Sequence, residues 1–425
     1  MRGEDSVGRC TTMIPTLGWA GLSRSALKRA EAQLFPGSEG VRDEVGVLAL
    51  HTAYADRFFP GTSVQQSRLR YALFVPWQIR MLLQRRDRIT AGQARAALEE
   101  AELDLASRLP DAAGEGTIGR RMAKVGKAVV IPPSQSYWVA LRVWGILHKG
   151  PSGTAPSRAE LFERWTKWPA GTRPGDMRED DDKRLLQPFM PLFHPALPEP
   201  PRQFSRGGPL DFRLEGPERA FLRTRLLDTY RPQDGEPSFL AALVRAGAAP
   251  GRSLVPWSSS IAAYADRSDQ EALHRARYAA SLSAIARAAY NAMVEALQEA
   301  KDGRTPSTRH RSHLVGVAAE FGPTALRLDL SALPSDGVSI GGLAAVLGRL
   351  QRWIRDSEDD VLTPYLYDAF WQWELGRKGS RRARLAKSTA SRLARDSWHG
   401  EEVGLAEPID YRWRLVTRLL RDLVD

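Results

Sequence analysis

Cysteine is nearly absent from this sequence, and so are long apolar runs. Cys10 is the only cysteine among the 425 residues, so no disulfide can form within the chain and an oxidising compartment would not stabilise it. No apolar run reaches the roughly 20 residues that a membrane helix needs. The first ten residues also lack the apolar stretch of a signal peptide. We therefore expect a cytoplasmic protein with no membrane partner, beginning with a flexible tail at residues 1–13.

The chain also lacks the spaced motifs of common catalytic and metal sites. His310 and His313 lie three residues apart, but no cysteine or carboxylate pair stands nearby to complete a metal shell. The acidic run at residues 179–182 lacks the glycine pivot of a calcium loop. The spacing from Gly119 to Lys127 is wrong for a phosphate-binding loop. We therefore expect no catalytic residue, no bound metal and no cofactor.

Positive charge is what the chain has in excess. Its 61 Lys and Arg residues against 50 Asp and Glu residues give a formal net charge of +11, and the isoelectric point is about 9.9. A surface this basic attracts polyanions over a Debye length of roughly 8 Å. Nucleic acid is the partner that this charge favours. A GC-rich coding sequence, which raises the arginine content without selection for binding, is the alternative source of the charge.

Apolar residues recur at helical spacing through most of the chain, and capping residues precede several of the runs. The longest run extends from Ser268 to Lys301, where Ser268 and Glu271 form a capping-box pattern. Short strands are expected only at residues 128–131 and 325–330. We predict a mainly α, helical multi-domain protein with a few short strands. Its predicted parts are an N-terminal helical domain at 14–168, a Pro-rich acidic linker at 169–209 and a C-terminal helical domain at 210–425.

Three basic elements carry the functional prediction. Residues 377–395 contain many cations and no acid, and the pattern predicts a helix from Arg381 to Ser397 with positive charge on every side. Such a helix repels itself unless an anion neutralises it; a solvated arm is the alternative. The other two elements are the loop at 120–127 and the segment from Arg68 onward, whose aromatic residues could stack on bases or pack in a core.

We expect these elements to fold into one continuous track for a polyphosphate strand. The candidate phosphate contacts are Arg68, Arg70, Arg120, Arg121, Lys124, Lys127, Arg381, Arg382, Arg384, Lys387, Arg392 and Arg395.

Several short motifs are spread over most of the chain: Leu17-Gly-Trp19, Phe58-Phe-Pro-Gly-Thr-Ser63, Gln66-Ser-Arg-Leu-Arg-Tyr71, Phe74-Val-Pro-Trp77, Pro133-Ser134, Tyr137-Trp138, Leu141-Arg-Val-Trp-Gly-Ile146 and Asp410-Tyr-Arg-Trp413. Together they resemble a bacterial family known only as a domain of unknown function. The resemblance implies a place among genes of anti-phage defence and DNA modification, beside helicases and phosphodiesterases. It assigns no residue a catalytic part.

The predicted function is a basic nucleic-acid-binding subunit of a bacterial anti-phage defence or DNA-processing complex. DNA is favoured over RNA, and helicase, phosphodiesterase or nuclease proteins are the expected protein partners. One alternative is a helical adaptor that bridges such partners, because the chain has 12 tryptophans and Trp, Tyr and Arg are common interface anchors. Another is an enzyme whose site is assembled from residues distant in the sequence.

Overall fold

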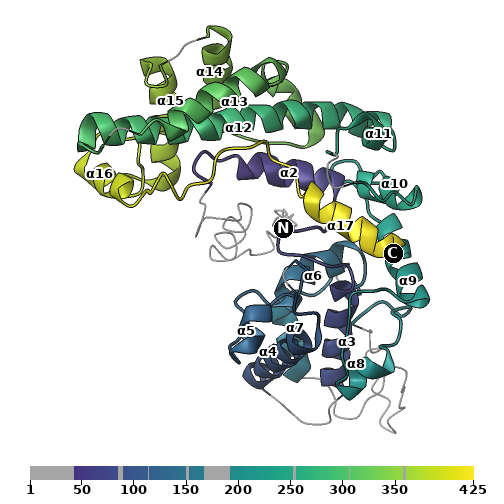
Figure 1. The fold of residues 1–425 in the computed structure, drawn as a ribbon. Helices are drawn as coiled ribbons and strands as arrows, with labels where there is room; N and C mark the ends of the chain where they lie inside the picture. Colours follow the sequence, from purple (N-terminus) through teal and green to yellow (C-terminus); the bar gives the residue numbers. More distant parts are fainter. Residues whose placement is uncertain are drawn as a thin grey trace, which may run out of the picture.

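The computed structural model describes residues 43–84, 90–112, 114–149, 153–166, 192–251, 255–305, 307–357 and 360–425. The predicted tail at 1–13 and most of the predicted linker lie outside these residues. Within them the fold is mainly α, as predicted (Figure 1). The β pairing in the described residues consists of two isolated bridges, Leu147 with Phe193 and Tyr230 with Pro237. The two predicted strands are therefore wrong.

Both segments took other conformations because no neighbouring strand pairs with them. Residues 128–131 form an irregular loop, whereas Ala325 ends α13 and Leu330 begins a 3-10 helix, Leu330–Asp336.

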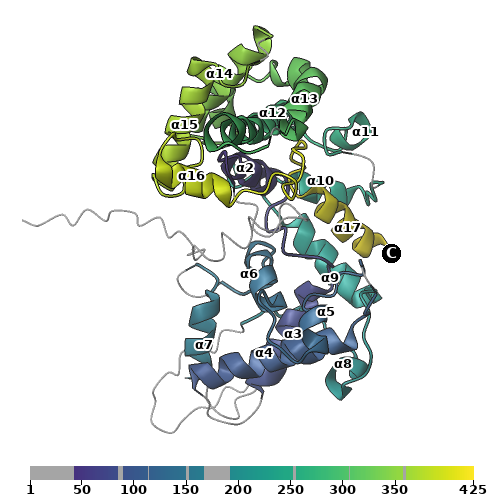
Figure 2. The same ribbon diagram turned by 60° about the vertical axis from the view of Figure 1, so that its left-hand side comes forward.

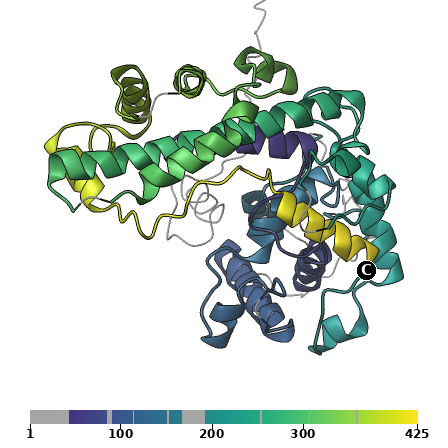
Figure 3. The same cartoon turned by 45° about the horizontal axis from the view of Figure 1, so that its top comes forward.

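The long helix α12 (Arg267–Asp302) is the central member of one half of the molecule. Helix α13 (Arg309–Ala325) runs back along it (Figure 3). Nearly every α12 residue from Ala279 to Gln298 is buried, so the helix is enclosed on all sides. The elements around it are α2 (Leu48–Phe58), α14 (Leu343–Arg355), α15 (Pro364–Lys378) and α16 (Thr389–Asp396).

The other half is built from shorter helices around an aromatic core. Its helices are α3 (Tyr71–Leu83), α4 (Ala91–Arg108), α5 (Arg120–Lys124), α6 (Pro133–Val143), α7 (Arg158–Thr166) and α8 (Arg202–Arg206). Tyr71, Phe74 and Trp77 of α3 are fully buried, which supports the packing interpretation of this stripe over base stacking. Four further helices lie where the halves meet or on the side of α12 (Figure 2). They are α9 (Gly216–Leu227), α10 (Phe239–Arg245), α11 (Ser259–Ala262) and α17 (Trp413–Val424).

The capping signals in the sequence were only partly right. Helix α12 begins at Arg267 rather than at Ser268, because Asp266 accepts a hydrogen bond from the backbone of Asp269 at 2.8 Å. At the start of α7, the Ser157 hydroxyl accepts from the Glu160 backbone and the Glu160 carboxylate accepts from the Ser157 backbone, which makes a capping box. The Gln66 side chain likewise accepts from the Ser63 backbone, but the next helix starts only at Tyr71.

Buried polar contacts join α2 to α12 and to the 3-10 helix Leu330–Asp336. The guanidinium of Arg57 lies 3.0 Å from the carboxylate of Asp269, and both side chains are almost fully buried. Asp336 accepts two hydrogen bonds from Arg275 and one from the Tyr54 hydroxyl. The apolar residues of both halves form one continuous buried cluster. The predicted limits of the N-terminal domain (14–168), the linker (169–209) and the C-terminal domain (210–425) remain a prediction.

Part of the predicted linker is described, and it packs against the core rather than running free. Phe193, Leu197 and Phe204 are buried there, and residues 202–206 form helix α8. In the described part of the chain, no helix is both long and apolar enough to cross a lipid bilayer.

Candidate nucleic-acid interface

The densest basic run forms an irregular strap of turns and bends that leads from α15 into the first turn of α16. We call residues 379–392 the basic strap. Gly379, with φ +72°, ends α15, and Ser388 caps α16 by accepting a hydrogen bond from the Ser391 backbone at 3.2 Å. The predicted helix from Arg381 to Ser397 is therefore wrong over its first half. Because the strap is not helical there, the prediction of a helix with positive charge on every side does not apply to it.

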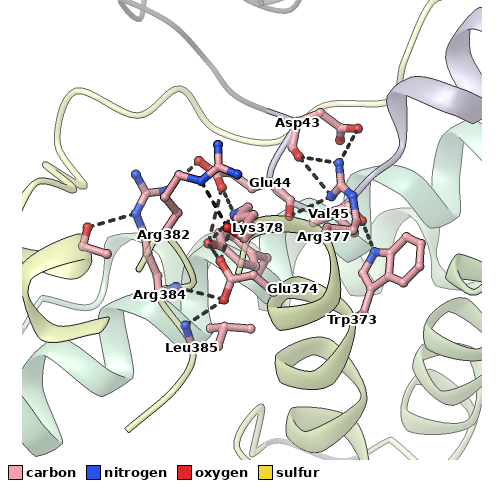
Figure 4. Close-up of polar contacts among 12 residues, drawn as sticks. Asp43, Glu44, Val45, Trp373, Glu374, Arg377, Lys378, Arg382, Arg384 and Leu385 are labelled. Atoms are coloured by element: carbon pink, nitrogen blue, oxygen red, sulfur yellow. Dashed lines mark hydrogen bonds and ion pairs between the residues drawn. The ribbon is translucent and has the colours of Figure 1, made fainter. Parts of the chain in front are cut away.

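Arg384 points from the strap into the protein (Figure 4). Its guanidinium donates to Glu44 at 2.5 Å. The backbone N–H groups of Arg384 and Leu385 both donate to one carboxylate oxygen of Glu374, at 3.0 and 2.8 Å. The strap is therefore fixed to α15 and to the segment that precedes α2 by a buried polar network.

Lys378 lies between the two carboxylates of this network. Its ammonium group contacts the Glu44 carboxylate and lies 2.8 Å from Oε1 of Glu374. The same Oε1 atom accepts a hydrogen bond from the Tyr290 hydroxyl at 2.6 Å. Burial opposes ionisation of Glu44, but the charges of Lys378 and Arg384 outweigh it and lower the pKa of that carboxyl. Burial raises the pKa of Tyr290 well above its ordinary value, and the two carboxylates raise it further. Glu44 is thus held ionised and Tyr290 neutral.

This network joins acids far apart in the sequence, which is the arrangement that the enzyme alternative requires. Every oxygen of Glu44 and Glu374 already accepts from a protein group. Each of the four carboxylate oxygens therefore has a protein donor, and the network holds the strap in place. Asp368, the other acidic residue of α15, is exposed.

Arg395 also serves the fold. It makes a bidentate pair with Asp302 at the end of α12, at 2.7 and 2.8 Å. Its remaining nitrogen donates to the carbonyls of Arg384 and Ala386 at 2.7 Å. The side chain is only 2% exposed. Arg384 and Arg395 are therefore not placed to meet a phosphate, and we remove both from the candidate set.

The other strap cations face solvent. Arg381, Arg382, Lys387 and Arg392 are exposed. Lys387 lies over the Tyr367 ring at 5.3 Å, and Arg382 donates to the Lys378 carbonyl at 3.1 Å. Within the described ranges, none of the four is within ion-pair distance of a carboxylate. The strap therefore presents four exposed cations that make no ion pair in the described residues, although Arg392 lies close enough to Asp302 to lower the pKa of that carboxyl.

The two arginines before α3 are structural. Arg70 is 3% exposed and pairs with Asp211 and Glu218 at 2.9 and 2.7 Å. Arg68 pairs with Asp422 of α17 at 2.9 Å, and that carboxylate also accepts from the Leu69 backbone. These contacts fix the start of α3 to α9 and α17, so Arg68 and Arg70 also leave the candidate set. Their sequence context gives no sign of these distant carboxylates.

The third basic element is a loop around α5, here called the basic loop (residues 119–131). Asp111 lies 2.6 Å from Lys124 and 3.7 Å from Arg120. Arg121 and Lys127 are exposed. Helices α5 and α16 lie apart in both views (Figures 1 and 2). The structure thus places the exposed cations in two separate patches, and the expected single track does not form.

No histidine takes part in either patch. His310 is buried beside Trp398 and lies 2.7 Å from the Gly400 carbonyl, and His313 lies 2.8 Å from the Ala406 carbonyl. A search of the described residues finds no group of three or more His, Cys, Asp or Glu residues placed to hold a metal.

Comparison with known proteins gives one match. A model of a family described as a family of unknown function (DUF6361) matches residues 15–157. This part of the chain is thus similar to an uncharacterised domain, and it includes the basic loop but not the strap. No curated protein matches the chain. No solved structure matches it either.

Proposed function

We propose that this protein binds nucleic acid through the basic strap, and that DNA is the ligand. The observation that carries the proposal is the set of four exposed strap cations, Arg381, Arg382, Lys387 and Arg392, none of which makes an ion pair within the described residues. A strap fixed by Arg384 and Arg395 loses little conformational entropy when a ligand binds, which favours affinity.

Binding of this kind is electrostatic and independent of base sequence. Each cation that neutralises a phosphate of duplex DNA releases condensed counterions and adds about 0.9 to the slope of log affinity against log salt. Four contacts therefore give a contribution of about 3 to 4 to that slope. The resemblance to a bacterial family linked to anti-phage defence supports a role as a cytoplasmic subunit of a defence or DNA-processing complex, with helicase, phosphodiesterase or nuclease partners.

The test compares two variants that lose the same charge. The strap variant is R381Q/R382Q/K387Q/R392Q. The control is R277Q/R327Q/R352Q/R355Q, in which four exposed arginines outside the strap are neutralised. Fluorescence anisotropy on duplex DNA across a salt series gives affinity and slope for each protein. We expect the strap variant to lose most of the slope and the control to keep most of it. Equal losses, or wild-type binding that ignores salt, would contradict the proposal.

The burial of the tryptophans removes the main support for an adaptor. Six tryptophans in the described residues are buried in the core: Trp77, Trp138, Trp144, Trp353, Trp398 and Trp413. Among the tryptophans whose side chains the structure describes, the other three, Trp257, Trp371 and Trp373, are half-buried. Packing therefore accounts for most of these described tryptophans, and we do not propose a separate adaptor site.

A further inference from the structure

The basic loop closes tightly on itself. Gly119 has φ +81°, and a Cβ atom built there would lie 2.4 Å from Cγ2 of Val129. The backbone N–H of Lys127 donates to the Met122 carbonyl at 3.0 Å, and that of Ala123 to the Gly119 carbonyl at 2.9 Å. Only glycine permits both the backbone conformation and this close approach. The two arms of the loop are therefore packed together.

The loop is also fixed where it joins the next helix. Immediately beyond it, the backbone N–H of Ser134 donates to the carboxylate of Glu102 on α4 at 2.6 Å, and both residues are buried. On the other side, Arg120 donates to the carbonyl of Asp111. The loop is thus held at both ends, and its backbone conformation determines which side chains face the solvent.

What the loop exposes is a mixture of cations and apolar side chains. Val125 is 59% exposed and Val130 is 66% exposed. Arg121 and Lys127 are exposed beside them in the chain, and the Lys124 side chain is 60% exposed. Cations alone are enough to bind a phosphate backbone. Because two exposed valines accompany them, the loop is better suited to a ligand that has both phosphates and apolar surface.

We propose that the basic loop binds single-stranded nucleic acid, with its cations on the phosphates and its two valines against the faces or edges of unpaired bases. This inference rests on the proposed function and narrows its ligand. In a duplex the base faces are stacked and hidden, whereas in a single strand each base presents an apolar face to the protein. A surface that carries both charge and apolar groups therefore gains more from a single strand.

An anionic membrane surface fits the loop less well. Loops and helices that enter the lipid interface use large side chains such as Trp, Phe and Leu, and residues 119–131 contain none of these. Burying the exposed parts of two valines stabilises an interfacial state by only about 2 kcal/mol in total. The bilayer is therefore tested as the contrary outcome.

The decisive variant is V125T/V130T, which exchanges one methyl group for a hydroxyl at each position and leaves the charge unchanged. V315T is the matched control, because Val315 on α13 is also 66% exposed. Each protein is titrated with a single-stranded oligonucleotide of about 15 nucleotides and with the duplex of the same length. We expect V125T/V130T to bind the single strand roughly fivefold more weakly, with an unchanged salt slope and little effect on the duplex. V315T should bind both ligands as the wild type does.

Three results would overturn the inference. They are unchanged single-strand affinity in V125T/V130T, equal weakening for strand and duplex, and valine-dependent binding to phosphatidylserine vesicles. Circular dichroism and thermal melting establish that each variant is folded. If the strap variant loses nucleic-acid binding while V125T/V130T does not, only the assignment of the loop fails. If the wild-type protein binds neither strand nor duplex, the proposed function fails with it.

Discussion

Arg384 and Glu44 lie 340 residues apart in the chain, yet the guanidinium of one donates to the carboxylate of the other at 2.5 Å. Arg384 belongs to the most basic segment of the protein, and the fold neutralises it internally. The contact divides the strap into two kinds of cation. Those that face inward determine its shape, and those that face outward are available to a ligand.

This division predicts that two arginines three residues apart contribute very differently to stability. Arg384→Gln leaves Glu44 with a weaker set of partners in a poorly solvated site, so we expect it to lower the free energy of unfolding by about 2–4 kcal/mol. Arg381→Gln removes an exposed cation and should change it by less than about 0.5 kcal/mol. Urea denaturation followed by circular dichroism measures both. Similar losses in the two variants would contradict the assignment of Arg384 to the interior.

Glu102 predicts a pH-dependent stability. Burial raises the pKa of its carboxyl to about 7, although the Ser134 backbone and Arg158 act to lower it. The ordinary value is 4.5, so the folded state holds this proton more tightly than the unfolded state. Its stabilising effect is therefore complete below about pH 4.5 and is lost as the pH rises to about 7. The loss amounts to about 3 kcal/mol at 1.36 kcal/mol per pKa unit.

Glu102→Gln provides the comparison, because the amide oxygen can still accept from the Ser134 backbone. Relative to the wild type, this variant should gain about 3 kcal/mol of unfolding free energy between pH 4.5 and pH 8. Urea denaturation at several pH values follows the difference. Parallel curves for the two proteins across this range would show that Glu102 does not titrate in it.

Arg57 and Asp269 should be strongly coupled. Burial raises the pKa of Asp269 to about 6, and the neighbouring charges of Arg57 and Arg231 partly oppose this rise. Arg57→Met leaves the carboxylate poorly compensated, so we expect a loss of about 3–5 kcal/mol in unfolding free energy. In the double variant with Asp269→Asn the two losses should fall short of additivity by about 1–3 kcal/mol. A double-mutant cycle by urea denaturation measures this coupling, and additive losses would argue against a direct pair.

Two glycines of the basic loop distinguish crowding from backbone strain. Gly119 and Gly126 both have positive φ, but only Gly119 faces a close neighbour, since nothing lies within 4 Å of a Cβ atom at Gly126. Gly126→Ala should cost about 1–2 kcal/mol from the left-handed backbone alone. Gly119→Ala should cost about 1–3 kcal/mol more, because Val129 must move. Thermal unfolding gives the difference, and hydrogen exchange of residues 120–130 locates it. Equal losses of stability in the two variants would show that Val129 moves away from the added Cβ atom without destabilising the fold.

The sequence predicted the helical class and the long helix α12 well, because both depend on local periodicity. The predicted end of that helix at Lys301 lies one residue from its observed end at Asp302. The strap was missed although its signals were present, since Gly379 and Ser388 are typical boundary residues. The high density of basic residues received more weight than those two boundaries. The predicted strands failed because alternation alone does not supply a pairing partner.

The roles of individual cations could not be predicted from a single sequence. Arg70, Arg384 and Arg395 are surrounded in sequence by residues much like those around Arg381 or Arg392. What distinguishes them is a carboxylate contributed by a distant segment, such as Glu218 or Asp302. The ion pair of Glu374 and Lys378, by contrast, has the i,i+4 spacing that a sequence can reveal.

The enclosure of α12 has a consequence for biosynthesis. A ribosome makes this helix before α13, α14 and α16, the segments that cover much of its surface. Until they emerge, the nascent chain exposes a long, alanine-rich helix to the cell. Its completion is therefore a late event in translation, and chaperone binding should be strongest in the interval before α13 has docked.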